Sequence, residues 1–60
     1  MTDFRDRIRI MSGPSVLDFA ERAGWRQGIA RVELRSRIAR GDVDDIDCER
    51  AMAVIGEAVA

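Results

Sequence analysis

Apolar residues recur at helical spacing between Gln27 and Arg40, and this segment constrains the fold more than any other part of the chain. At 100° per residue they form two strips instead of one. The first strip comprises Ala30, Leu34 and Ile38, and the second, made of small and apolar residues, comprises Ile29, Val32, Ser36 and Ala39. A helix on the surface of a globular domain needs only one apolar stripe. We therefore expect this helix either to lie at the centre of the fold or to present one strip to a partner.

The N-terminal segment Asp3–Met11 is also expected to be helical. Its apolar residues fall at i, i+4 and i+7, and Thr2 precedes them as a candidate N-cap. The alternation of arginine with other residues fits a strand as well, but no second strand is visible to pair with it. We expect Ser12-Gly13-Pro14 to end this segment.

A short helix is predicted over Ser15–Ala23. Ser15 and Asp18 have the spacing of a capping box, with aspartate in place of the usual glutamate or glutamine. The predicted apolar face comprises Val16, Phe19, Ala20 and Ala23. Gly24 suits the left-handed position after a helix, and Trp25 is expected to fold back onto the helix that has just ended.

The last predicted helix spans Ile46–Val59, after Gly41 and an acidic connection. Its predicted buried face comprises Cys48, Ala51, Met52, Ile55 and Val59. Acidic residues crowd its N-terminus, where the helix dipole favours negative charge. The sequence therefore predicts an all-α fold: a compact bundle of three to four short helices, forming a single domain over residues 1–60.

Charge is distributed unevenly along the chain. Residues 1–40 hold nine arginines against five acidic residues, whereas residues 41–60 hold one arginine against six. Every basic residue is arginine, which favours paired hydrogen bonds to carboxylates or phosphates. The single cysteine excludes a disulfide within the monomer, and no apolar run is long enough for a signal peptide or a membrane span. We expect a soluble, cytoplasmic protein.

Catalysis has little support in the sequence, so we expect a protein that is not an enzyme. The chain has no histidine, which leaves its serines without an evident activating base. Cys48 lies on an expected apolar face, which favours a small buried hydrophobe over a nucleophile. The acidic residues from Asp42 to Glu49 lack the spacing of a calcium loop, and no phosphate-binding glycine motif is present. We expect no metal, no cofactor and no small-molecule substrate.

The segment Leu17–Ala30 resembles the helix-turn-helix of phage-type regulators. In that family a small residue precedes the glycine of the turn by four positions, as Ala20 precedes Gly24, and apolar residues flank the turn. The resemblance implies a DNA-binding transcriptional regulator whose second helix reads the duplex. The residues that it implies for base edges or phosphates are Arg26, Gln27 and Arg31. The chain departs from the family at Glu33, where a β-branched residue is usual.

The leading hypothesis is a non-enzymatic interaction protein that binds and modulates a larger macromolecule. In this interpretation the second strip, edged by arginine, docks on a protein partner or on a second copy, and the acidic connection can imitate nucleic acid toward a partner. The residues expected to bind the partner are Ile29, Val32, Arg35, Ser36, Ala39, Asp42, Asp44 and Asp45. Small proteins of this kind are often regulators or inhibitors encoded by phages and mobile elements, an analogy only.

Overall fold

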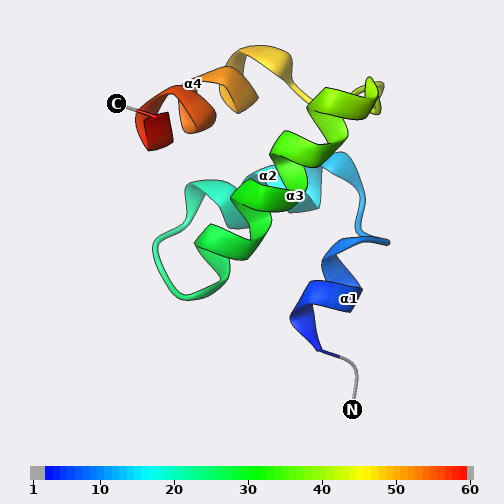
Figure 1. Cartoon of the computed structure of the whole chain (residues 1–60), viewed down its shortest axis with the longest axis vertical. Coiled ribbons are helices and arrows are strands. Elements are labelled where there is room, and N and C mark those ends of the chain that lie inside the picture. The colour runs from blue at the N-terminus through cyan, green and yellow to red at the C-terminus, as the bar shows by residue number, and fades with distance from the viewer. Residues whose placement is uncertain (1–2, 60) are drawn as a thin grey trace.

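The computed structural model describes residues 3–59, with side chains up to residue 56. The helices in this part are α1 (Phe4–Ile8), α2 (Gly13–Glu21), α3 (Arg26–Arg40) and α4 (Cys48–Val59). Figure 1 shows α3 crossing the middle of the molecule, with α1 at one end and α4 at the other. No strand occurs among residues 3–59. The predicted all-α bundle is therefore confirmed, and the strand alternative for the N-terminal segment is wrong.

The hydrophobic core forms around α3. Its buried residues are Phe4, Ile8, Val16, Leu17, Ala20, Ala30, Leu34, Ile46, Ala51 and Val54. Ala30 and Leu34 are fully buried, and Ile38 packs against the same cluster, so the first strip of α3 is a core face as predicted. Gly41 adopts a left-handed φ of 76° and ends α3, which also agrees with the prediction.

Helix α1 is shorter than the predicted Asp3–Met11 segment. It ends at Ile8, and the next residues form a turn in which the Met11 amide donates to the Ile8 carbonyl over 3.3 Å. Asp3 occupies the N-cap position without a side-chain hydrogen bond. Thr2, the predicted N-cap, lies outside the described residues.

Helix α2 begins two residues before the predicted start at Ser15. Ser12 is the N-cap residue, and Pro14 lies in the first turn, where its missing N–H would have had no partner in the helix anyway. The Gly13 amide instead donates to Asp45 Oδ2 over 2.7 Å. The predicted capping box is therefore wrong, because a carboxylate distant in sequence caps this helix.

The far end of α2 also differs from the prediction. The helix ends at Glu21, and Gly24 has a φ of 136°, outside the left-handed helical region that was expected. Ala23 is exposed, and Leu17 takes the buried place on this helix that the predicted face omits. Trp25 is 63% exposed and packs edge to face with Phe4 of α1.

Helix α4 packs through part of the predicted face: Ala51 is buried and Ile55 packs against the core, as predicted, but Cys48 and Met52 do not. It begins at Cys48, and Asp47 Oδ1 accepts a hydrogen bond from the Arg50 amide over 3.2 Å, so an acidic residue caps it as expected. Ala51 and Val54 are buried, whereas Cys48 and Met52 are exposed. Ala51 thus faces the core, whereas its neighbour Met52 points about 100° around the helix from it. The burial predicted for Val59 concerns a side chain outside the description.

Candidate functional site

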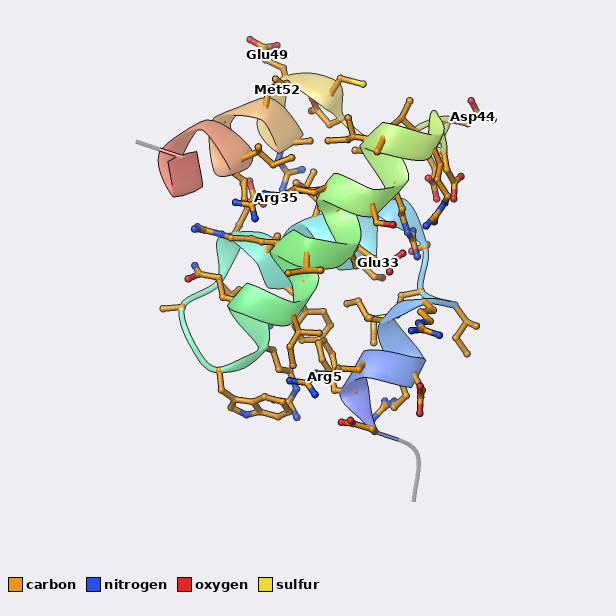
Figure 2. The ribbon with its side chains drawn as sticks, viewed as in Figure 1. Arg5, Glu33, Arg35, Asp44, Glu49 and Met52 are labelled. Atoms are coloured by element: carbon orange, nitrogen blue, oxygen red, sulfur yellow. The ribbon has the colours of Figure 1, made fainter. Side chains whose placement is uncertain are left out.

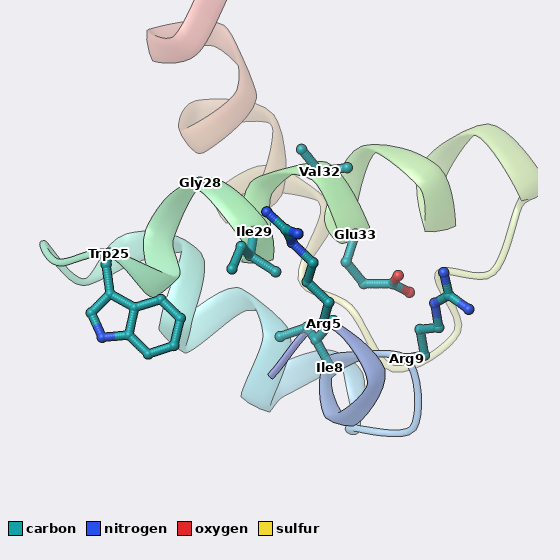
Figure 3. Close-up of a pocket in the computed structure, with 8 residues that line it drawn as sticks. All are labelled: Arg5, Ile8, Arg9, Trp25, Gly28, Ile29, Val32 and Glu33. Atoms are coloured by element: carbon teal, nitrogen blue, oxygen red, sulfur yellow. The ribbon is translucent and has the colours of Figure 1, made fainter. Parts of the chain in front are cut away.

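A groove of about 680 Å³ runs between α1 and the first half of α3, and we call it the α1–α3 groove. Figure 3 shows its lining: Arg5, Ile8, Arg9, Trp25, Gly28, Ile29, Val32 and Glu33. The volume lies within the range of about 300–1,000 Å³ that is usual for ligand pockets. The groove therefore has the size of a binding site, and part of the predicted second strip lines it.

The groove combines a buried apolar floor with exposed apolar edges. Ile8 contributes from α1 and is buried, and Ile29 contributes from α3 and is half-buried. Val32 and Trp25 are each 63% exposed. Single exposed apolar side chains are common on protein surfaces, but several that gather around a groove are typical of interaction surfaces.

Arg37 holds α1 in the position that forms one wall of the groove. Its Nη2 donates to the carbonyl oxygens of Ile8 and Met11 over 3.0 and 2.8 Å, and to that of Arg9 over 3.3 Å. These carbonyls belong to the last residue of α1 and to the turn that follows it, where the regular hydrogen bonds of the helix have ended. Through these hydrogen bonds Arg37 caps the C-terminal end of α1, and because it is only 5% exposed it does so from within the core.

Glu33 neutralises this buried arginine from within α3. Its Oε2 accepts from Arg37 Nε over 2.8 Å and lies 3.7 Å from Arg40 Nη2. Arg37 lies outside both predicted strips of α3, and its burial was not predicted from the sequence. Two features of the sequence pointed to this role of Arg37. Glu33 and Arg37 have the i, i+4 spacing of a helical ion pair, and no glycine follows Ile8 to cap the end of α1.

Trp25, which lines the groove, belongs to an aromatic cluster. Phe4 meets Phe19 and Trp25 edge to face, with ring centroids 5.1 and 5.8 Å apart. The guanidinium carbon of Arg26 lies 4.4 Å from the centroid of Trp25 and 5.4 Å from that of Phe4. Such contacts between a cation and an aromatic face are attractive. Arg26 therefore fixes the exposed tryptophan at the mouth of the groove.

The residues predicted to bind a partner separate into two groups on α3. Ile29 and Val32 line the groove, whereas Arg35 and Ala39 are exposed farther along the helix. Ser36 accepts a hydrogen bond from Arg40 Nη1 over 2.7 Å, which uses its hydroxyl within the chain. The second strip thus continues the groove as an exposed face of α3.

The predicted acidic residues lie away from the groove. Figure 2 shows Asp44 at the end of the molecule opposite Arg5. Asp42 lies 3.6 Å from Arg40 Nη2, and Asp45 caps α2 through Gly13. Asp45 therefore has a structural role that the sequence analysis missed, since its hydrogen bond partner is distant in sequence.

The residues predicted to read DNA make contacts within the chain. Arg31 Nε donates to the Ala20 carbonyl at the end of α2 over 3.2 Å. Arg26 stacks on Trp25, and Gln27 is half-buried. The side chains of Arg26 and Arg31 are thus engaged in contacts within the chain.

Other features of the described chain supply few further chemical possibilities. Among the described residues, no three acidic, cysteine or histidine side chains converge on a common point that could hold a metal ion. Cys48 is exposed, not buried as expected. No helix in residues 3–59 has the length and apolar character needed to cross a membrane.

One exposed ion pair joins α2 to α4. Arg50 donates to both carboxylate oxygens of Glu21, with 3.2 Å between Nε and Oε2. The hydrogen bonds from Arg50 lower the pKa of Glu21 below its ordinary value, and the same contacts raise the pKa of Arg50. This pair fastens α4 away from the α1–α3 groove.

Comparisons of the chain with models of protein families, with curated proteins and with solved structures find no match.

Proposed function

We propose that the chain is a non-enzymatic interaction protein that binds a larger protein partner through the α1–α3 groove and modulates it. The observation that carries this proposal is the pairing of a buried floor with two strongly exposed apolar side chains, Val32 and Trp25. Because these two side chains stay in contact with water, the small domain loses the stabilisation that burying their apolar surface would give. A partner that covers them recovers that burial.

The chemistry of the groove favours an acidic, partly apolar partner segment. Arg5 and Arg9 lie at the α1 edge and are exposed, and Arg35 continues the positive edge along α3. The one acidic lining residue, Glu33, is already paired with Arg37. Tryptophan and arginine are the residues most enriched where binding energy concentrates in protein interfaces. A helix with apolar residues on one face and carboxylates beside them meets these requirements.

A regulator or inhibitor is the class of interaction protein that we propose. A small helical domain with an exposed groove can cover a site on a larger protein. This step rests on the groove, and it names no particular target.

DNA recognition is the weaker alternative. It requires Arg26 and Arg31 to leave the contacts that they make with Trp25 and with the Ala20 carbonyl. The acidic last third of the chain would also repel phosphate. These observations favour a protein partner over a duplex.

Capture with matched variants tests the proposal. The immobilised chain is expected to retain a partner from a lysate of its source organism, and Val32→Glu is expected to lose it, because an unpaired carboxylate would be buried in the interface. Ile10→Glu is the matched control, since Ile10 is 87% exposed and lies outside the groove. Equal capture by wild type and both variants would exclude the groove as the binding site.

A further inference from the structure

We propose that a second copy of the chain occupies the α1–α3 groove when no other partner is bound, by inserting the outer face of its α4. The proposal rests on the proposed function, because it uses the same groove, and it adds the identity of one occupant. The resulting contact is head to tail: the groove of one copy receives α4 of the next.

The outer face of α4 has the chemistry that the groove requires. Met52 is 59% exposed at its centre, and a flexible methionine side chain fits irregular apolar hollows. Glu49 lies one turn before it, and Asp47 and Asp44 precede the helix; all three are exposed. Figure 2 shows Glu49 and Met52 pointing away from the bundle. The exposed Met52 side chain, with carboxylates on its N-terminal side, is therefore available for contact with another molecule.

Charge complementarity selects this face over other parts of the chain. The groove is edged by Arg5 and Arg9, whereas residues 41–60 hold six acidic residues against one arginine. Symmetric packing of groove against groove would instead bring the Arg5 and Arg9 edges of two copies together, a like-charge contact that disfavours it. Opposite charges thus favour the head-to-tail arrangement.

The two surfaces cannot meet within one molecule. Ala51 and Val54 fix α4 against the core, and Arg50 ties it to Glu21. Figure 1 places α4 and α1 at opposite ends of the molecule. Each copy therefore keeps one surface free after its other surface has been occupied, and such a heterologous contact adds further copies unless it closes into a ring.

The association is expected to be weak. A stable protein interface buries about 800 Å² on each partner, which is about a fifth of the 4160 Å² that this chain exposes. A single groove and one helix face cover less than that. Weak contact suits the role, because a stronger partner must be able to displace the second copy.

Sedimentation equilibrium of the purified chain tests the proposal. The weight-average mass is expected to rise above that of the monomer as concentration increases, and to fall back with added salt, because the edges of the contact are charged. Val32→Glu and Met52→Arg should each weaken association at least tenfold. Both positions are mostly exposed, so both variants should keep the wild-type thermal melt. Ile10→Glu and Ile10→Arg are the matched controls and should associate like wild type.

Mixing the two variants gives the sharpest result. Val32→Glu retains a usable α4, and Met52→Arg retains a usable groove, so the mixture is expected to form one-to-one dimers and nothing larger. If Val32→Glu shows no cooperative thermal unfolding, the double variant Arg5→Glu and Arg9→Glu replaces it, because both arginine side chains are exposed. A wild-type chain that stays monomeric at millimolar concentration, or a mixture that stays monomeric, would overturn the proposal.

The outcome is separable from that of the proposed function. If the wild type is monomeric but Val32→Glu loses a captured partner, the groove binds a foreign protein and only the self-association is wrong. If the chain self-associates and Val32→Glu still captures its partner, the groove serves the second copy and the partner-binding proposal is wrong.

Discussion

Arg37 Nε donates to Glu33 Oε2 over 2.8 Å while the same guanidinium caps the carbonyl end of α1. The planar fork of arginine makes this double use feasible, because its donors point in fixed and different directions. The pair is nearly buried, with side chains 6% and 12% exposed. Arg37 of α3 therefore holds α1 in place, and α1 contributes Ile8 to the lining of the groove.

We predict that Arg37→Met destabilises the fold by about 3 kcal/mol, because the nearly buried Glu33 carboxylate loses its 2.8 Å hydrogen bond and the carbonyls of Ile8 and Met11 lose their arginine donor. Urea denaturation followed by circular dichroism measures the change. Arg35→Met, on the same helix but exposed, is the control and should change stability little. Equal stability of the two variants would show that Arg37 is not the cap that holds α1.

Gly13→Ala should destabilise the chain by roughly 1–3 kcal/mol through overpacking. A Cβ at Gly13 would lie 2.6 Å from Ile46 Cγ1 and in contact with the Asp45 carboxylate that caps α2. Gly28→Ala is the contrasting variant, since nothing lies within 4 Å of its Cβ position. There the gain in helix propensity should stabilise the chain by about 0.5–1 kcal/mol. Thermal melts that shift in the same direction for both variants would contradict this packing.

The sequence predicted those parts of the fold that depend on local signals. The spacing of Ala30 and Leu34 identified the buried face of α3, and Gly41 marked its end, because periodicity and left-handed glycine are properties of one segment. The groove was predicted in part: Ile29 and Val32 were identified from the second strip. Its other wall, in α1, was not.

Features that depend on contacts distant in sequence were missed. Asp45 caps α2 across 32 positions, and Arg37 caps α1 across 29, and no local pattern specifies either partner. The buried face of α4 was predicted in part for a similar reason. Ala51 and Ile55 were assigned correctly, but the adjacent Met52 was also expected to be buried, and only the packing of α4 against the core shows that it is exposed.

The Glu21–Arg50 pair predicts a small dependence of stability on pH. Because the hydrogen bonds from Arg50 lower the folded-state pKa of Glu21 below its ordinary value of 4.5, the unfolded chain binds more protons in this range. The stabilisation is then fully present above pH 4.5 and is lost as the pH falls through the folded-state pKa. Glu21→Gln should melt below wild type at pH 7, and the difference should shrink at pH 3. A difference independent of pH would exclude this ion pair as its source.

Arg31→Ala separates a structural role from DNA reading. The variant loses the hydrogen bond to the Ala20 carbonyl and should lower stability by about 1 kcal/mol. Duplex binding measured by fluorescence anisotropy at low salt should be negligible for wild type and variant alike. Steeply salt-dependent binding that Arg31→Ala weakens in a fully folded chain would favour the helix-turn-helix interpretation instead.

Trp25 gives the most direct test of the claim that the groove is the binding surface. It is the single tryptophan of the chain, it lines the groove and it is 63% exposed. Occupation of the groove, by a partner or by a second copy, should move its fluorescence emission to shorter wavelength and protect it from quenching by acrylamide. A complex that forms without changing the emission or the quenching of Trp25 would contradict the account.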